Sequence, residues 1–195
     1  MRRSHKKSLS ALVPIAIKIS DQTLRHFGNL TSQQLNWKPD ADQWSIAQCF
    51  DHLVTANADY FPIFDKLLSG EGKNTAWEKL PLLPSFCGKL VLKAVSPETA
   101  RKRKNPKIFN PSSSGVDENI ILRFIDQQND LVGYMKATEE FELEKIIISS
   151  PVSRLITYSL MDAYRIMVSH EERHLLQAVR VLEMDRFPNS IPQPS

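Results

Sequence analysis

The sequence has few cysteines, no long apolar run and little net charge, and each shortage excludes a class of protein. Cys49 and Cys87 lie far apart without C-x-x-C spacing, which excludes a disulfide framework and favours buried free thiols in a reducing compartment. No apolar run approaches the ~18 residues of a membrane span. The net charge is only +3, and no nucleic-acid-binding motif accompanies a basic stripe. We therefore expect a cytoplasmic protein that binds neither membranes nor nucleic acid.

The composition that remains is typical of one globular domain with a hydrophobic core. Of the 195 residues, 42% are hydrophobic and 24% are charged, which is enough apolar surface to stabilise a single domain of this length. Helical periodicity dominates the chain, and no segment alternates like a strand for long. The predicted fold class is all-α.

Four long amphipathic segments predict the main helices. Apolar positions at i, i+3 and i+4 indicate helices over residues 14–26, 44–64, 117–138 and 153–184. Ser45 or Asp42 is the expected cap of the second helix, and Pro62 should kink or shorten it. We divide the chain into a basic, flexible N-terminus (1–13), the helical domain (14–186) and a tail (187–195).

The segment between the second and third helices is long and irregular. Residues 69–116 contain several prolines, which predict a broken connection with one short helix at about 85–95 lying over the other helices. The basic run at 101–107 is most simply a solvated loop. Four helices with such a crossover between helices 2 and 3 indicate a four-helix bundle.

The last helix carries a pair of histidines at metal-ligand spacing. His170 and His174 are four residues apart in VSHEERHLLQ, so on a helix they lie ~40° apart around the axis and ~6 Å apart along it. Both fall in the middle of the apolar face. Two buried imidazoles need partners for their nitrogens, and one metal ion satisfies both.

A third histidine lies on the second helix. His52 falls at the edge of the apolar stripe of that helix, where its ring can point along the bundle wall toward a neighbouring helix. Three imidazole ligands leave a fourth position open for water or substrate, as in catalytic zinc sites. The predicted metal ligands are therefore His52, His170 and His174, and the predicted cofactor is a divalent metal ion, zinc or nickel first.

Several nearby side chains carry weaker signals. Gln48 and Gln177 are spaced to orient the imidazoles, and Arg173 could contact an anionic substrate or extend to solvent. Asn57 and Tyr60 could line a pocket, and Trp44, like Trp37, is expected to pack the end of the bundle. Packing is also the simpler role for Cys49.

Two alternative functions fit the same residues. HEERH matches the zincin pattern H-E-x-x-H with Glu171 as general base, although Gln177 and Arg180 stand where metzincins have Gly and His, and no strand is expected to present a peptide. If Glu171 has no catalytic role, we expect it to be a charged residue at the edge of the apolar stripe of the last helix. The second alternative is a non-catalytic bundle whose histidines are merely hydrogen-bonded and whose surface binds a partner.

Together, three segments of the sequence resemble the DinB-like (damage-inducible) superfamily, in its DinB_2 subgroup. They are NWKPDADQWSIAQCFDHL, KNPKIFNP and SHEERHLLQAVRV, and the similarity extends from about residue 15 to residue 186. The resemblance implies a four-helix bundle with a metal held by three histidines, which match His52, His170 and His174.

The resemblance also implies a range of activities. Characterised members include metal-dependent transferases that join low-molecular-weight thiols to electrophiles, and a maleylpyruvate isomerase. We therefore expect a small-molecule substrate, with a thiol as the first choice, because a thiol at the open position would lose its proton and become a nucleophile. A water activated at the same position would give hydrolase chemistry instead. A homodimer is expected from the resemblance alone.

Overall fold

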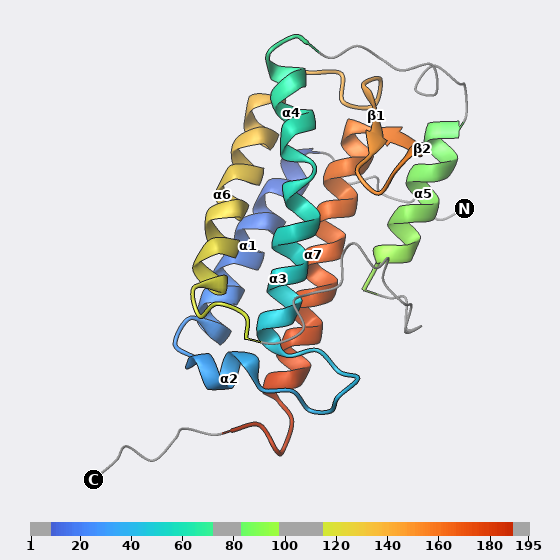
Figure 1. Ribbon diagram of the computed structural model, residues 1–195. Helices are drawn as coiled ribbons and strands as arrows, with labels where there is room; N and C mark the ends of the chain where they lie inside the picture. The colour runs from blue at the N-terminus through green and yellow to red at the C-terminus, as the bar shows by residue number, and fades with distance from the viewer. Residues whose placement is uncertain (1–8, 72–82, 98–114, 189–195) are drawn as a thin grey trace.

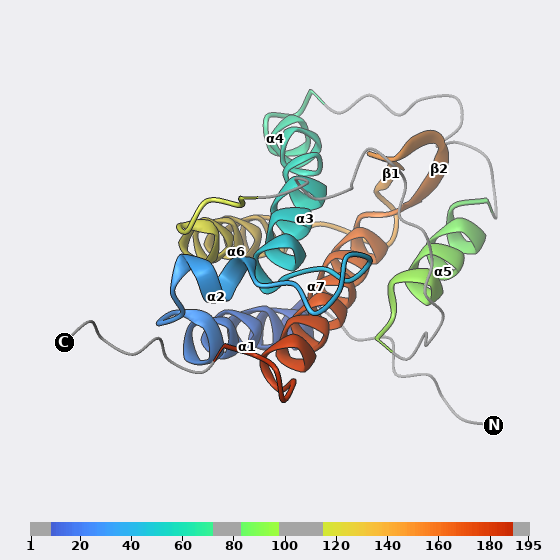
Figure 2. The same ribbon diagram turned by 60° about the horizontal axis from the view of Figure 1, so that its bottom comes forward.

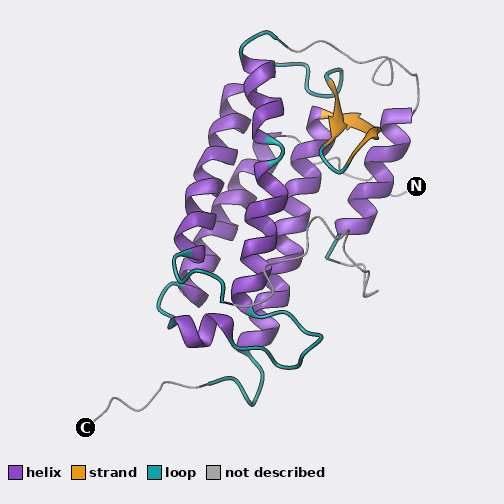
Figure 3. Ribbon diagram, viewed as in Figure 1, coloured by secondary structure: helices purple, strands orange, loops and turns teal. Residues whose placement is uncertain are grey.

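The computed structural model describes residues 9–71, 83–97 and 115–188, which are mostly helical (Figures 1 and 3). The elements are α1 (Leu9–Phe27), α2 (Ser32–Asn36), α3 (Ile46–Ala58), α4 (Phe61–Leu68), α5 (Leu83–Val95), α6 (Ile120–Ala137), β1 (Ile147–Ser150), β2 (Ser153–Ser159) and α7 (Leu160–Leu182). The predicted basic loop at 101–107 lies outside the described residues, as do the ends of the chain at 1–8 and 189–195. Within the described ranges, no helix has both the length and the apolar character needed to cross a membrane.

Helices α1, α3, α6 and α7 form the predicted four-helix bundle. Both α1 and α3 pack against α6 and α7, so α1 and α3 occupy opposite corners of the bundle (Figure 2). The interior between them is filled by large side chains with almost no exposure, among them Phe27, Phe50, Phe124, Leu131 and Tyr164. The all-α bundle predicted from periodicity is confirmed.

The first helix begins before its predicted start. The prediction placed the start at Pro14, because proline fits the first turn of a helix. In the structure α1 begins at Leu9 and Pro14 lies inside it. Leu9 and Leu12 are buried in the core, and burial of these side chains stabilises the extra turn.

The second predicted helix is divided into α3 and α4. Ser45 caps α3 through a capping box, in which its Oγ accepts from the backbone N–H of Gln48 and its own N–H donates to Gln48 Oε1, each at 3.1 Å. α3 ends at Ala58, and Pro62 lies in the first turn of α4, where its missing N–H leaves no hydrogen bond unmade. Pro62 was predicted to kink or shorten the second helix, and in the structure that helix is divided just before Pro62.

The main correction concerns the segment before the last helix. Residues 153–159 form strand β2 rather than the first turns of a helix, and β2 pairs antiparallel with β1. α7 starts at Leu160, where Ser159 Oγ accepts from the N–H of Asp162 at 3.0 Å. The last three residues of β2 are buried consecutively, so β2 lacks the alternation that marks a strand in sequence.

The long crossover contains helix α5, which packs outside the bundle against β2 and α7 (Figure 2). This agrees with the short helix predicted at 85–95. Gly88 permits the close approach, because a Cβ at this position would lie 2.7 Å from Asp162 Oδ2 and 3.2 Å from Tyr158 Cβ. The hairpin and α5 therefore form an added wall beside the α3–α7 face of the bundle.

Candidate metal centre

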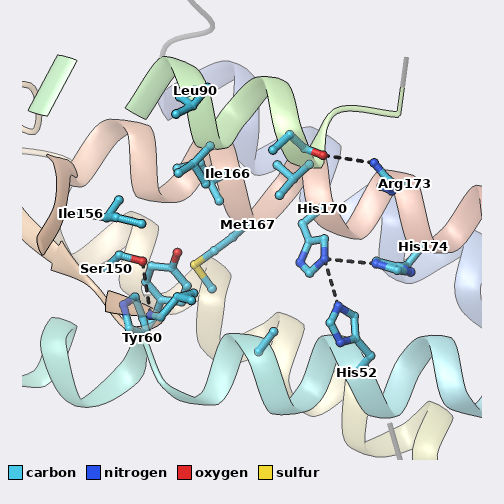
Figure 4. A pocket seen from close by; sticks show the side chains of 16 residues that line it. His52, Tyr60, Leu90, Ser150, Ile156, Ile166, Met167, His170, Arg173 and His174 are labelled. Atoms are coloured by element: carbon cyan, nitrogen blue, oxygen red, sulfur yellow. Dashed lines mark hydrogen bonds between the residues drawn. The ribbon is translucent and has the colours of Figure 1, made fainter. Parts of the chain in front are cut away.

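Three histidines from two helices meet between α3 and α7. His52 comes from α3, and His170 and His174 come from α7. The Nε2 atom of His170 lies 3.1 Å from Nε2 of His52 and 3.1 Å from Nε2 of His174 (Figure 4). The ligand atoms of all three side chains lie within 4.8 Å of one another. The structure thus brings together the three residues predicted from the sequence.

The spacing of the three nitrogens suits a single divalent ion. Tetrahedral coordination at Zn–N distances of ~2.0–2.1 Å places neighbouring ligand nitrogens about 3.3 Å apart. The two 3.1 Å separations in the triad are close to this value. Direct hydrogen bonding accounts for the cluster less well, because the single Nε2 of His170 would have to serve both neighbours.

The surroundings of His170 and His174 favour their neutral form. Burial, together with the neighbouring His52 and Arg173, lowers the pKa of His170 to about 3. Burial also holds the pKa of His174 well below its ordinary value, as do the nearby His170, His52 and Arg173, while a contact with Gln177 opposes the shift. Neutral imidazole is the form that ligates a metal.

Trp44 covers the side of the triad near the start of α3. Its ring stacks on that of His174 at a centroid distance of 5.5 Å and an angle of 15°, and it lies 5.1 Å from the ring of His52 at an angle of 57°. Trp44 was expected to pack the end of the bundle, and its contact with two histidines was not predicted. The sequence signal is its position immediately before the cap of the helix that carries His52.

The triad opens into a cavity of about 420 Å³ between the bundle and the added wall. The cavity is lined by side chains from α3, α5, the hairpin and α7 (Figure 4). Most of its lining is aliphatic, and Arg173 is its cationic residue. Arg173 lies beside the triad, and its Nη1 donates to the carbonyl oxygen of Ala94 at 3.1 Å. A ligand in this cavity can therefore reach the open side of the triad.

Glu171 occupies a different place from the one predicted. It is fully buried in the bundle interior, where its Oε1 accepts from Asn57 Nδ2 at 2.7 Å. Its expected role as a stripe-edge charge is wrong, because neighbouring helices cover that side of α7 too. Glu171 does not line the cavity, so it lacks the position that the zincin mechanism requires of a general base.

The remaining candidates divide between the cavity and the core. Tyr60 lines the cavity as predicted, whereas Asn57 contacts Glu171 in the core. The side-chain oxygen of Gln48 accepts from the N–H of Ser45 in the capping box. Cys49 is fully buried and its thiol pKa is raised by that burial, so packing is its role.

The fold and the site together place the chain among helical bundles with a candidate metal site, because two facing helices bring three histidines together at a cavity. The chain belongs to the DinB superfamily, whose family model matches residues 18–178. It is similar to uncharacterized protein YuaE of Bacillus subtilis (strain 168), at 23% identity over 163 residues that span 83% of this chain and 91% of that protein. No solved structure matches the chain significantly. The family predicted from the sequence is confirmed.

Proposed function

We propose that the chain binds one divalent metal ion through His52, His170 and His174 and uses it to transfer a low-molecular-weight thiol to a small electrophile. The observation that carries the proposal is the convergence of three Nε2 atoms at the edge of a cavity of about 420 Å³. Three protein ligands with a fourth side facing a cavity is the arrangement of catalytic rather than structural zinc sites.

The protein's own residues would prepare the site for this reaction. A bound metal lowers the pKa of a thiol at the open position, so that it is a thiolate at neutral pH. His52, His170 and His174 hold the ion in a fixed geometry, since two of the three rings are packed against Trp44. The guanidinium of Arg173 beside the triad favours an anionic group there. The aliphatic lining limits water around the reacting groups.

The donor set supports zinc or nickel as the ion. Three imidazoles are ligands of intermediate softness that suit zinc, copper, nickel and iron. Among the described residues, the triad contains no carboxylate or thiolate ligand, which argues against magnesium or calcium because these ions require oxygen ligands. The free cysteines support a cytoplasmic location, and the homodimer rests on the family resemblance.

The activity is tested by mixing zinc- or nickel-loaded protein with small thiols and a chromogenic electrophile. We expect thiol consumption to depend on the metal and to be lost in His174→Ala. His26→Ala is the matched control, because His26 lies on α1 outside the triad and its replacement should leave the rate unchanged. A rate that is equal in wild type, His174→Ala and metal-stripped protein would contradict the proposal.

Metal-dependent hydrolysis is the second candidate function. The same open side of the triad could activate water instead of a thiol, and the accessible cavity allows either. Hydrolysis of a chromogenic ester by loaded protein without added thiol would favour this alternative. Metal binding with neither activity would favour a non-catalytic binding protein.

A further inference from the structure

The cavity has two chemically different ends. One end holds the three histidines and Arg173. The opposite end is formed by Tyr60, and between the two ends lie aliphatic side chains such as Met167 and Ile166 from α7 (Figure 4). A ligand that spans the cavity must therefore match a polar, cationic head region and a long apolar wall.

The Tyr60 end offers less polarity than its residue type suggests. The hydroxyl of Tyr60 is hydrogen-bonded to the hydroxyl of Tyr158 at 2.6 Å, and both side chains are buried. The two hydroxyl groups thus satisfy each other and leave little hydrogen-bonding capacity for a ligand. Tyr60 presents mainly its ring to the cavity, and Oγ of the neighbouring Ser150 accepts from the backbone N–H of Val152 at 3.3 Å (Figure 4). The far end therefore suits an apolar group.

The aliphatic lining of the cavity continues onto the outer surface of α5 and the hairpin. Leu90 of α5 and Val152 of the hairpin turn both line the cavity, yet their exposed fractions are 57% and 48%. Exposed aliphatic surface that is continuous with a cavity is a common sign of a binding site for an apolar ligand. A bound apolar chain would cover these two side chains and gain their burial.

We propose that the cavity binds amphiphilic small molecules, with an anionic, metal-ligating head at the triad and an apolar body lying between α5, the hairpin and α7 toward Tyr60. The predicted head group of the ligand depends on the proposed metal function. The predicted apolar body depends only on the aliphatic lining of the cavity, so the two parts can be tested separately. Arg173 supplies the positive charge that selects an anionic head over a neutral one.

The test uses n-alkyl hydroxamates, whose head group chelates metals, in a series from acetyl to decanoyl. Their dissociation constants for zinc-loaded protein are measured by titration calorimetry. Each added methylene should tighten binding about three- to fourfold until the chain outgrows the cavity. The same affinity for all chain lengths would overturn the inference.

Matched surface variants locate the body of the ligand. Val152→Glu places a charge in the apolar wall and should weaken decanoyl hydroxamate at least tenfold while leaving acetohydroxamate unchanged. Leu155→Glu is the control, because Leu155 belongs to the same hairpin and is 61% exposed but does not line the cavity. Both positions are exposed, so neither variant should prevent folding. Equal weakening by the two variants would contradict the proposed binding path.

Metal-stripped protein separates this inference from the proposed metal function. Chain-length dependence that persists without metal, together with no zinc-dependent gain for the short hydroxamates, would support the apolar site and count against the metal site. Zinc-dependent binding of short hydroxamates with no gain from longer chains would support the metal site and overturn the apolar site. Leu90→Glu, with the exposed Phe86→Glu as its control on α5, repeats the comparison on the other wall.

Discussion

The interface between α3 and α7 carries two polar clusters that differ in how their polar atoms are satisfied. Asn57 and Glu171 form a hydrogen-bonded pair in the core, in which Asn57 Nδ2 donates to Glu171 Oε1 at 2.7 Å. A few residues away, His52, His170 and His174 direct three Nε2 atoms toward one another at the edge of a cavity. The members of the first cluster are hydrogen-bonded to each other, whereas the three Nε2 atoms of the second cluster surround a common point.

This difference separates a structural polar cluster from a candidate ligand site. The hydrogen bond from Asn57 to Glu171 stabilises the native state because a buried donor meets a buried acceptor. Three converging imidazole nitrogens cannot satisfy one another equally, since each nitrogen is either a donor or an acceptor. A divalent ion accepts all three lone pairs. In metal-free protein, loss of a side chain should therefore lower the free energy of unfolding more in the Asn57–Glu171 pair than in the histidine cluster. In metal-loaded protein, loss of a histidine should also remove the stabilisation that the metal provides.

The largest effect is expected from breaking the Asn57–Glu171 pair in metal-free protein. Asn57→Ala removes the hydrogen bond to Glu171 Oε1 and should lower the free energy of unfolding by about 3 kcal/mol. His52→Ala is the comparison on the same helix, and it should lower that free energy by about 1 kcal/mol or less, because it relieves a crowded cluster. Urea denaturation in the presence of a chelator measures both. Equal losses would show that the two clusters do not differ in this way.

The next effect is stabilisation by added metal. Zinc at a hundredfold excess over its dissociation constant should add about 2.7 kcal/mol to the unfolding free energy of wild type. For a domain of this size, that corresponds to a rise in melting temperature of roughly 5–10 °C. The rise should disappear in His170→Ala and remain in His26→Ala. Thermal unfolding followed by circular dichroism measures it, and an equal rise in all three proteins would count against the triad.

Per pH unit, a smaller effect is expected from the titration of Glu171. Burial raises its pKa from 4.5 to about 8, so the folded chain holds a proton that the unfolded chain releases. This contribution to stability is present below the unfolded pKa and is lost as the pH rises toward 8. Glu171→Gln removes the titration, so the variant should gain about 1.4 kcal/mol relative to wild type for each pH unit between about 5 and 8.

Urea denaturation of metal-free protein across this pH range measures the effect of Glu171→Gln. Glu140→Gln is the control, because Glu140 is exposed and should give a pH profile parallel to wild type. A flat difference between Glu171→Gln and wild type would contradict the prediction.

The smallest effect concerns Trp44. Its ring packs against His174 and His52, so Trp44→Ala should loosen both rings and weaken zinc binding about two- to tenfold. Trp37→Ala is a matched control, because Trp37 packs instead against Phe187 at a centroid distance of 5.6 Å. Competition with a chromogenic chelator measures both affinities. Weakening by Trp37→Ala alone would show that Trp44 does not support the triad.

Helical phase explains why the triad could be predicted from the sequence. His170 and His174 fall on one face of a long helix, and His52 falls at the edge of the face that α3 turns toward α7. The position of Glu171 could not be predicted in the same way, because periodicity assumes one buried face. α7 contacts α1, α3 and α5, so residues on several sides of it are buried.

The fold was predictable where periodicity is sustained over several turns. The bundle helices and the break near Pro62 follow from local spacing and proline chemistry. The β1–β2 hairpin was missed, because strand β2 shows no alternation and its residues continue the apolar pattern of α7. Its pairing with β1 and its contacts with α5 are tertiary interactions that override local preference. The hairpin part of the added wall could therefore not be predicted from the sequence, whereas α5 was predicted as a short helix over the bundle.

The central claim is that the three histidines hold one metal ion, and metal content tests it most directly. Untagged wild-type protein and the variants His174→Ala and His26→Ala would be purified in parallel and examined by elemental analysis. The account predicts a single divalent ion per chain in wild type and His26→Ala, and little or none in His174→Ala. Equal metal content in wild type and His174→Ala would contradict it.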